Sequence, residues 1–176
     1  MNWRLFSITS IAVVFLLVIL FMGFFYDPHA VPSVLVNRPA PSFSLIEHQG
    51  TNWNLLQNQG KPIVINFWAS WCQPCIDELA TLAKLSQDYK ERITFIGILY
   101  QDTTENAQAI LHEYSQYFPQ LLDHAGLVAI DYGVAGIPES FIIDSKGIIR
   151  QKIVGIINPD QLRHDLDILL MSNSTP

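Results

Sequence analysis

The sequence predicts an α/β fold in which a central mixed β-sheet is flanked by helices. Two runs rich in β-branched residues, 63–68 and 93–100, are each followed by an amphipathic helical pattern. A hairpin pattern and a last helical pattern complete the chain. Strands that alternate with helices favour a parallel sheet covered by helices, and the hairpin adds an antiparallel part.

The N-terminal half of the folded part carries the patterns of three strands. An edge strand is expected at 42–46, followed by a turn-rich connection over 50–60 with a short helix near 53–57. The segment 63–68 is an almost continuous apolar run, which is typical of a strand buried on both faces. The segment 93–100 repeats this pattern.

The helices are predicted from apolar periodicity and from capping residues. A helix over 74–92 has leucines at helical spacing and a charged opposite face. A second helix is expected over 103–118, with Thr103 or Thr104 as its N-cap, and a shorter one over 127–132.

The C-terminal part predicts a hairpin and a final helix. Strands at 141–143 and 148–154 are expected to be joined by a turn through Asp-Ser-Lys-Gly. Asn158 should cap the last helix, with Pro159 at its first position.

The N-terminal segment is expected to cross a membrane. No charged residue occurs from Leu5 to Tyr26, and a helix of this length reaches about 33 Å at about 1.5 Å per residue. A cleaved signal peptide and a buried core helix are the alternatives, although the residues after the run fit a cleavage site poorly. Because Arg4 precedes the span, the N-terminus is expected in the cytoplasm and the rest of the chain outside it.

Length and charge limit the remaining possibilities. The chain has 176 residues and a net charge of -6, which allows one compact domain with an appendage. Since no basic cluster is present, nucleic-acid binding is not expected. The predicted organisation is a membrane anchor at 1–26, a proline-containing linker at 27–37 and a folded domain at 38–176.

The two cysteines of the chain lie in the segment 71–75, Trp-Cys-Gln-Pro-Cys, at the start of a helical pattern. Right-handed crossovers place the end of strand 63–68 at the carboxyl edge of the sheet, where α/β folds hold reactive groups. Such a pair can close and reopen a disulfide, and the helix N-terminus stabilises a thiolate at Cys72. Cys72 is therefore predicted to attack, and Cys75 to resolve the mixed disulfide.

A cysteine pair at this spacing can also be half of a zinc site. The chain has no second pair, and its five histidines are scattered without ligand spacing, so no metal is expected. Ile76 follows Cys75, so the C-x-x-C-H motif of covalent haem attachment is absent and no cofactor is expected.

Three segments together resemble the thioredoxin superfamily: the cysteine motif at 71–75, Gly-Ile-Pro-Glu-Ser at 136–140 and the hairpin over 141–154. Within it, the chain is similar to the membrane-anchored thiol:disulfide oxidoreductases of cytochrome c maturation, the CcmG/DsbE group and its TlpA/ResA-type relatives. The resemblance runs from about residue 38 to 170 and implies a thioredoxin-like fold.

The resemblance also implies roles around the cysteines. Pro138 matches the proline that follows a cis peptide bond and faces the cysteine pair, which would leave the backbone of Ile137 free to pair with an extended substrate. Trp71 is either a contact surface beside Cys72 or simple core. Glu139, next to this proline, is expected to act on the thiolate through its charge.

Glu78 is a second acidic candidate, because it follows Cys75 by one helical turn. The alternative for Glu78 is a solvated carboxylate that interacts with the helix dipole. Neutral Gln73 and Pro74 lack the cation that would stabilise the reduced thiolate, so a reductant is favoured over an oxidant.

The function expected from the resemblance is extracytoplasmic disulfide reduction in cytochrome c maturation, on the periplasmic side of a bacterial inner membrane. The substrate would be apocytochrome c or its carrier, the electron donor a membrane protein of the DsbD/CcdA type, and residues 5–26 would contact lipid.

Three other functions are compatible with parts of this pattern. A general periplasmic oxidase or isomerase would use the same fold. A tethered metal chaperone of thioredoxin fold would carry C-x-x-x-C and a partnered histidine, whereas this spacing is shorter. A peroxidase is disfavoured, because Ala69 stands where its threonine would be.

Overall fold

The computed structural model describes residues 3–24 and 34–173. The chain divides into two compact units, Met1–Pro32 and Ser33–Pro176. The first contains helix α1 (Trp3–Phe24). Across the described ranges, no helix combines the length and the apolar character needed to span a bilayer. Most of the predicted linker at 27–37 lies outside the described residues, and Leu35 already packs against the second unit's core, before the predicted start at residue 38.

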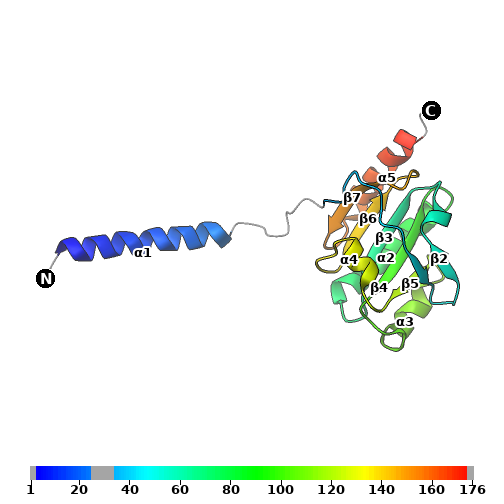
Figure 1. The fold of residues 1–176 in the computed structure, drawn as a ribbon, viewed down its shortest axis with the longest axis horizontal. Helices are drawn as coiled ribbons and strands as arrows, with labels where there is room; N and C mark the ends of the chain where they lie inside the picture. Colours follow the sequence, from blue (N-terminus) through cyan, green and yellow to red (C-terminus); the bar gives the residue numbers. More distant parts are fainter. Residues whose placement is uncertain (1–2, 25–33, 174–176) are drawn as a thin grey trace. The chain divides into compact units, whose positions relative to one another are not determined.

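The second unit is built on a five-stranded sheet in the order β5-β4-β3-β6-β7 (Figure 1). Neighbours β3 and β4, and β4 and β5, are parallel, whereas β6 runs antiparallel to both β3 and β7. The predicted mixed sheet is therefore confirmed. Its strands are β3 (Ile63–Trp68), β4 (Thr94–Tyr100), β5 (Gln120–Asp123), β6 (Glu139–Ile143) and β7 (Ile149–Val154).

A separate two-stranded sheet pairs β1 (Ser44–Ile46) with β2 (Asn52–Asn54). Strands β2 and β5 are not predicted from the sequence, because strands of three or four residues are too short to show alternation. The short helix expected near 53–57 is instead β2 followed by the 3-10 turn η1 (Leu56–Asn58). Asn54 Oδ1 accepts the N–H of Leu56 at 2.9 Å, which favours a turn at this point.

The helices of the second unit begin close to the predicted residues. Thr103 Oγ1 accepts the N–H of Asn106 at 3.2 Å and caps one of them, and Asn158 Oδ1 accepts the N–H of Asp160 at 3.0 Å at the start of the last. These helices are α2 (Gln73–Asp88), α3 (Thr104–Tyr114), α4 (Leu127–Asp131) and α5 (Pro159–Asn173). Helix α2 ends earlier than predicted, because Tyr89 leaves helical geometry with φ -109°.

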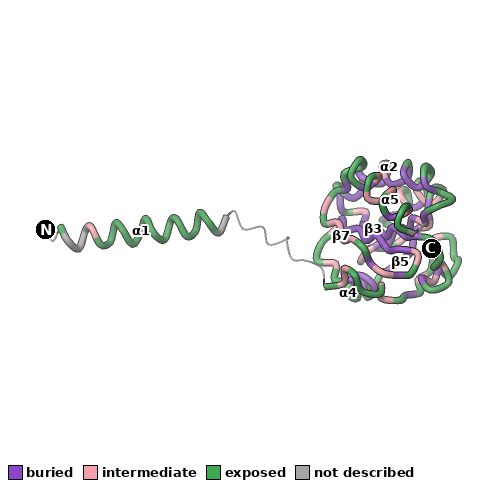
Figure 2. The backbone as a smooth tube through the Cα atoms, turned by 90° about the horizontal axis from the view of Figure 1, so that it is seen from above, coloured by how far each residue is buried: buried purple, intermediate pink, exposed green. Residues whose placement is uncertain are grey.

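Each face of the sheet packs against different elements. Helices α2, α3 and α5 cover one face, around Leu79 and Leu111, while α4 and β2 cover the other, around Val128 and Trp53. Strand β3 lies between these layers and is buried along its whole length (Figure 2). The predicted helices on both faces are confirmed, and the cysteines follow the carboxyl end of β3.

Candidate active site at the carboxyl edge of the sheet

Cys72 and Cys75 form a disulfide at the N-terminus of α2, with their Cα atoms 5.3 Å apart. Cys72 is the N-cap of this helix, and its Sγ accepts the N–H of Cys75 at 3.3 Å. Cys72 is 6% exposed, whereas Cys75 is 0% exposed. An incoming sulfur can therefore reach only Cys72, and the amide and the helix dipole stabilise a thiolate at that position.

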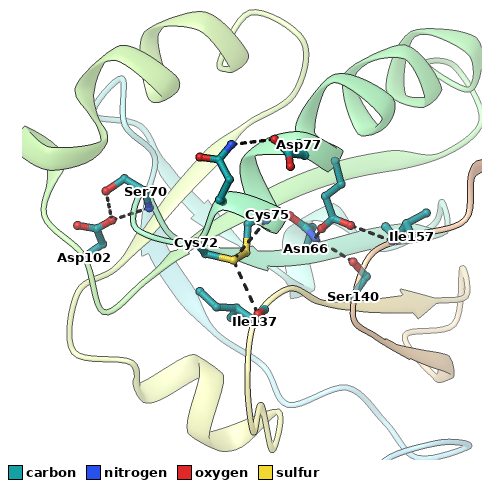
Figure 3. The surroundings of a disulfide bond; sticks show 11 residues. Asn66, Ser70, Cys72, Cys75, Asp77, Asp102, Ile137, Ser140 and Ile157 are labelled. Carbon is teal, nitrogen blue, oxygen red and sulfur yellow. Dashed lines mark hydrogen bonds between the residues drawn. A yellow bond between two sulfur atoms is a disulfide. The ribbon is translucent and has the colours of Figure 1, made fainter.

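The segment before β6 faces the disulfide. The Ile137–Pro138 peptide bond is cis, as the resemblance implies. The carbonyl oxygen of Ile137 lies 3.8 Å from Cys72 Sγ (Figure 3). Trp71 is 62% exposed, so its ring belongs to the surface beside Cys72 and not to the core. These residues leave a backbone acceptor and an aromatic surface next to the reachable sulfur.

A buried polar network lies on the α2 side of the sheet. Glu78 Oε1 accepts a hydrogen bond from Asn66 Nδ2 at 2.7 Å, and Oε2 accepts the N–H of Ile157 at 2.9 Å. Asn66 Nδ2 also donates to Ser140 Oγ at 3.0 Å (Figure 3). Burial raises the pKa of Glu78 above its ordinary value, although the bonds from Ile157 and Asn66 oppose this shift. Glu78 is thus a buried carboxyl, not the solvated one of the alternative prediction.

Glu139 lies on the other face of the sheet. It pairs across strands with Phe67, whose side chain belongs to the core on the α4 side. Its Oε2 forms an ion pair with Lys152 Nζ at 2.9 Å, and this amine also donates to the Gly133 carbonyl at 2.8 Å. The structure therefore gives Glu139 a cation as its partner, and a role of Glu139 at the thiolate stays a prediction.

Two groups of polar residues were not identified from the sequence. Asn66 and Ser140 connect β3 and β6 to Glu78, and Asp102 binds Ser70 just before the cysteines. Asn66 has a signal in the sequence, because an amide inside an otherwise apolar buried strand requires partners. Asp102 has one as well, since it follows β4 closely at the carboxyl edge.

The described residues contain no group of three or more histidine, cysteine or acidic side chains that could hold a metal ion. The chemistry available at this edge is that of the two sulfurs and their polar neighbours. A reachable sulfur, a buried sulfur beside it and a buried carboxyl one helical turn further along can together exchange a disulfide and transfer a proton.

Comparisons with known proteins agree with this chemistry. The model of the AhpC/TSA family matches residues 36–152. The thiol:disulfide interchange protein DsbE of Allochromatium vinosum is 41% identical over 143 residues, which cover 80% of this chain and 78% of the relative. The thiol:disulfide interchange protein HelX of Rhodobacter capsulatus is 36% identical over 149 residues, with 82% of each chain covered. Among solved structures, a chain described as a DsbE of Chlorobium tepidum has a TM-score of 0.70 and 27% identity, and the match covers 75% of this chain and 95% of that one.

We expect Glu78→Gln to make stability less dependent on pH. A carboxyl with a raised pKa binds its proton more tightly in the folded state than in the unfolded chain, where the pKa is about 4.3. It stabilises the fold below that value, and this contribution is lost as pH rises through the folded pKa. The free energy of unfolding in urea, measured from about pH 4 to 8, should fall more steeply in the wild type than in Glu78→Gln. The exposed neighbour Asp77, changed to Asn, is the matched control and should keep the wild-type slope; equal slopes for all three proteins would contradict the role of Glu78.

We expect Glu139→Gln to lower the free energy of unfolding by about 1–3 kcal/mol, because it leaves Lys152 without its counter-charge. The expected loss is smaller than that for a fully buried ion pair, because the side chain of Lys152 is 13% exposed and water can solvate part of its charge. Adding Lys152→Met should restore part of the loss. The exposed pair of Asp88 and Arg163 provides the control, and Asp88→Asn should cost less than about 1 kcal/mol. A loss for Glu139→Gln no larger than that of the control would show that the ion pair contributes little.

Proposed function

The chain belongs to the AhpC/TSA family, and from its thiol:disulfide interchange relatives and the geometry of its cysteines we propose that it reduces protein disulfides during cytochrome c maturation. The relatives with 36–41% identity are thiol:disulfide interchange proteins, and the chain is a thiol:disulfide oxidoreductase of the same kind. The observation that carries the proposal is the Cys72–Cys75 disulfide, with only Cys72 reachable and the carbonyl of Ile137 beside it.

The reaction starts from the dithiol form. The Cys72 thiolate attacks one sulfur of the substrate disulfide, and the other substrate sulfur leaves as a thiolate that takes up a proton. Cys75 then loses its proton and attacks Cys72 Sγ in the mixed disulfide. The Cys72–Cys75 disulfide forms, and the second substrate sulfur leaves. Two electrons pass from the protein to the substrate, whose two sulfurs become thiols.

Glu78 is proposed as the acceptor for the Cys75 proton. It lies one helical turn after Cys75 on α2, and both side chains are buried, so water has little access to the proton. Burial raises the pKa of Glu78 above its ordinary value, which makes its carboxylate a stronger base than a solvated one. The backbone of Ile137, which precedes Pro138, and the exposed ring of Trp71 are proposed to bind the substrate segment.

The proposed direction is reduction of the substrate. A cation near Cys72 would stabilise the thiolate and make the protein an oxidant. Residues 73 and 74 are neutral instead, and the buried ionisable residue of α2 that follows the cysteines, Glu78, is acidic. The proposed substrate is apocytochrome c or its carrier, and the proposed electron donor is a membrane protein of the DsbD/CcdA type. The support for these partners is the resemblance to the cytochrome c maturation group.

The proposed location is the periplasmic side of a bacterial inner membrane, with residues 1–26 as an uncleaved anchor that contacts lipid through residues 5–26. The support is the uncharged run from Leu5 to Tyr26 and the helical conformation of Trp3–Phe24. A reductant of secreted proteins must act where their disulfides form, which is outside the cytoplasm.

The full chain should have a reduction potential nearer to that of thioredoxin, about -270 mV, than to that of the strong oxidant DsbA, about -120 mV. Equilibration in detergent against a series of glutathione redox buffers measures this value. A potential above about -160 mV would overturn the reductant and favour the general oxidase.

Cys75→Ser should trap substrates in cells as mixed disulfides through Cys72, because the resolving sulfur is absent while the nucleophile remains. Cys72→Ser should trap none and serves as the control. Mass spectrometry should identify apocytochrome c or its carrier among the trapped proteins, and deletion of the gene should lower c-type cytochrome content unless a thiol is added. Trapping through Cys75 would reverse the two roles, and unchanged cytochrome content would overturn the pathway.

The full chain should remain in the membrane fraction after alkaline carbonate washing, and a chain that begins at residue 27 should not. An externally added protease should digest the catalytic domain in spheroplasts only if this domain lies outside the cytoplasm. Release of the full chain by carbonate, or protection of the domain in intact spheroplasts, would contradict the anchor or its orientation.

A further inference from the structure

Asp102 is a buried carboxylate with no part in the reaction described above. It is 6% exposed. Its Oδ2 accepts two hydrogen bonds from Ser70, one from the backbone N–H at 2.7 Å and one from Oγ at 2.6 Å. Its Oδ1 accepts the N–H of Thr103 at 2.7 Å and Asn106 Nδ2 at 3.3 Å. Figure 3 shows Asp102 and Ser70 on one side of the disulfide and Ser140 and Ile157 on the other.

Ser70 belongs to the tight turn that delivers Cys72 to the helix. The N–H of Cys72 donates to the carbonyl of Ala69 at 3.2 Å, so Ser70 and Trp71 are the two central residues of a β-turn. Both donors that Ser70 directs to Asp102 lie in this turn. The carboxylate therefore fixes the segment between the end of β3 and the N-cap of α2.

The main chain of Asp102 is itself held against the sheet. Gln101 has φ +46°, and its N–H donates to the Asp123 carbonyl at 3.2 Å. On the other side, His124 Nδ1 lies 2.6 Å from the carbonyl oxygen of Asp102. A left-handed conformation in a residue other than glycine is uncommon, and here it turns the chain after β4 toward Ser70. Asp102 thus connects the cysteine turn to the ends of β4 and β5.

The carboxylate form suits this arrangement. Burial alone would raise the pKa of Asp102, but the hydrogen bonds from Ser70, Thr103 and Asn106 outweigh it and lower the pKa below its ordinary value. An ionised carboxylate accepts all four bonds, whereas a protonated one has a hydrogen on one oxygen. Asp102 is therefore ionised throughout the neutral range.

We propose that Asp102 is a positioning residue, which holds Cys72 beside Cys75 through Ser70 and so raises the effective concentration of one sulfur at the other. This inference rests on the proposed disulfide exchange and extends it to the ring-closing step. In that step Cys75 attacks Cys72 Sγ, the disulfide to the partner sulfur breaks, the Cys72–Cys75 bond forms, and the partner leaves as a thiolate that takes up the proton lost by Cys75. A turn that moves would slow this step and weaken the disulfide.

Two variants test the contact in different ways. Ser70→Ala removes one of the two bonds to Asp102 and keeps the charge. Asp102→Asn keeps the shape, removes the charge and turns one acceptor into a donor. Thr103→Ala is the matched control, because it removes the N-cap of α3 and keeps both bonds between Ser70 and Asp102. All three variants remove a hydrogen bond near the carboxyl edge of the sheet, but only Ser70→Ala and Asp102→Asn change the contact between Ser70 and Asp102.

The full chain in detergent, with glutathione disulfide as the probe, gives two measurements: the equilibrium constant for the Cys72–Cys75 disulfide, and the rate at which the mixed glutathione disulfide at Cys72 resolves. We expect Ser70→Ala to lower both by about two- to threefold and Asp102→Asn by about three- to tenfold. A tenfold change corresponds to a potential about 30 mV less negative. Thr103→Ala should lower the melting temperature and leave both constants within about 1.5-fold of the wild type.

If Asp102→Asn does not fold, the comparison of Ser70→Ala with Thr103→Ala still tests the proposal, because Ser70→Ala changes the same contact. Wild-type constants in Ser70→Ala, or an equal shift in Thr103→Ala, would overturn the positioning role while leaving the proposed function intact. A wild-type chain that forms no mixed disulfide with glutathione would overturn both.

Discussion

The site depends on one constraint, the fixed junction between a fully buried strand and the first residue of a helix. Strand β3 has no exposed residue, so the place where it ends is set by packing on both sides of the sheet. Helix α2 begins at Gln73, and the N-cap position of Cys72 follows from this start. The position of the N-cap provides both the amide that faces Cys72 Sγ and the burial of Cys75. Reactivity at one sulfur and protection of the other thus have the same structural origin.

Burial of polar groups near this junction costs free energy that the fold must offset. Asn66 and Glu78 are 1% and 3% exposed, and each would destabilise the core without a partner. Their mutual hydrogen bond, with those to Ser140 and Ile157, satisfies most of this need. A purely apolar replacement would be simpler to pack. That the chain retains a carboxyl here is consistent with a chemical role, because natural proteins depart from optimal packing mainly at functional sites.

Features that depend on neighbouring residues in the chain can be predicted from the sequence. Contacts between residues far apart in the chain cannot be predicted in this way. Buried strands such as β3, the caps Thr103 and Asn158, and the cysteine motif all depend on neighbouring residues, and the structure has them where they were predicted. The partner of Glu139 could not be predicted in this way. Lys152 lies on β7, and the pairing of β6 with β7 places the two on one face, which requires knowledge of register. The contact of Asp102 with Ser70 likewise joins residues 32 positions apart.

The two buried carboxyls that flank the cysteines differ in the balance between burial and hydrogen bonding. Glu78 accepts two hydrogen bonds, and burial prevails, so its pKa is raised. Asp102 accepts four, and they prevail over burial, so its pKa is lowered. The raised pKa makes the Glu78 carboxylate a stronger base than an ordinary one, as a proton acceptor requires, whereas Asp102 remains a fixed charge that orders a turn. In this proposal, proton transfer and positioning belong to different residues on opposite sides of the disulfide, while Glu139 pairs with Lys152 on the α4 side of the sheet and its role at the thiolate stays a prediction.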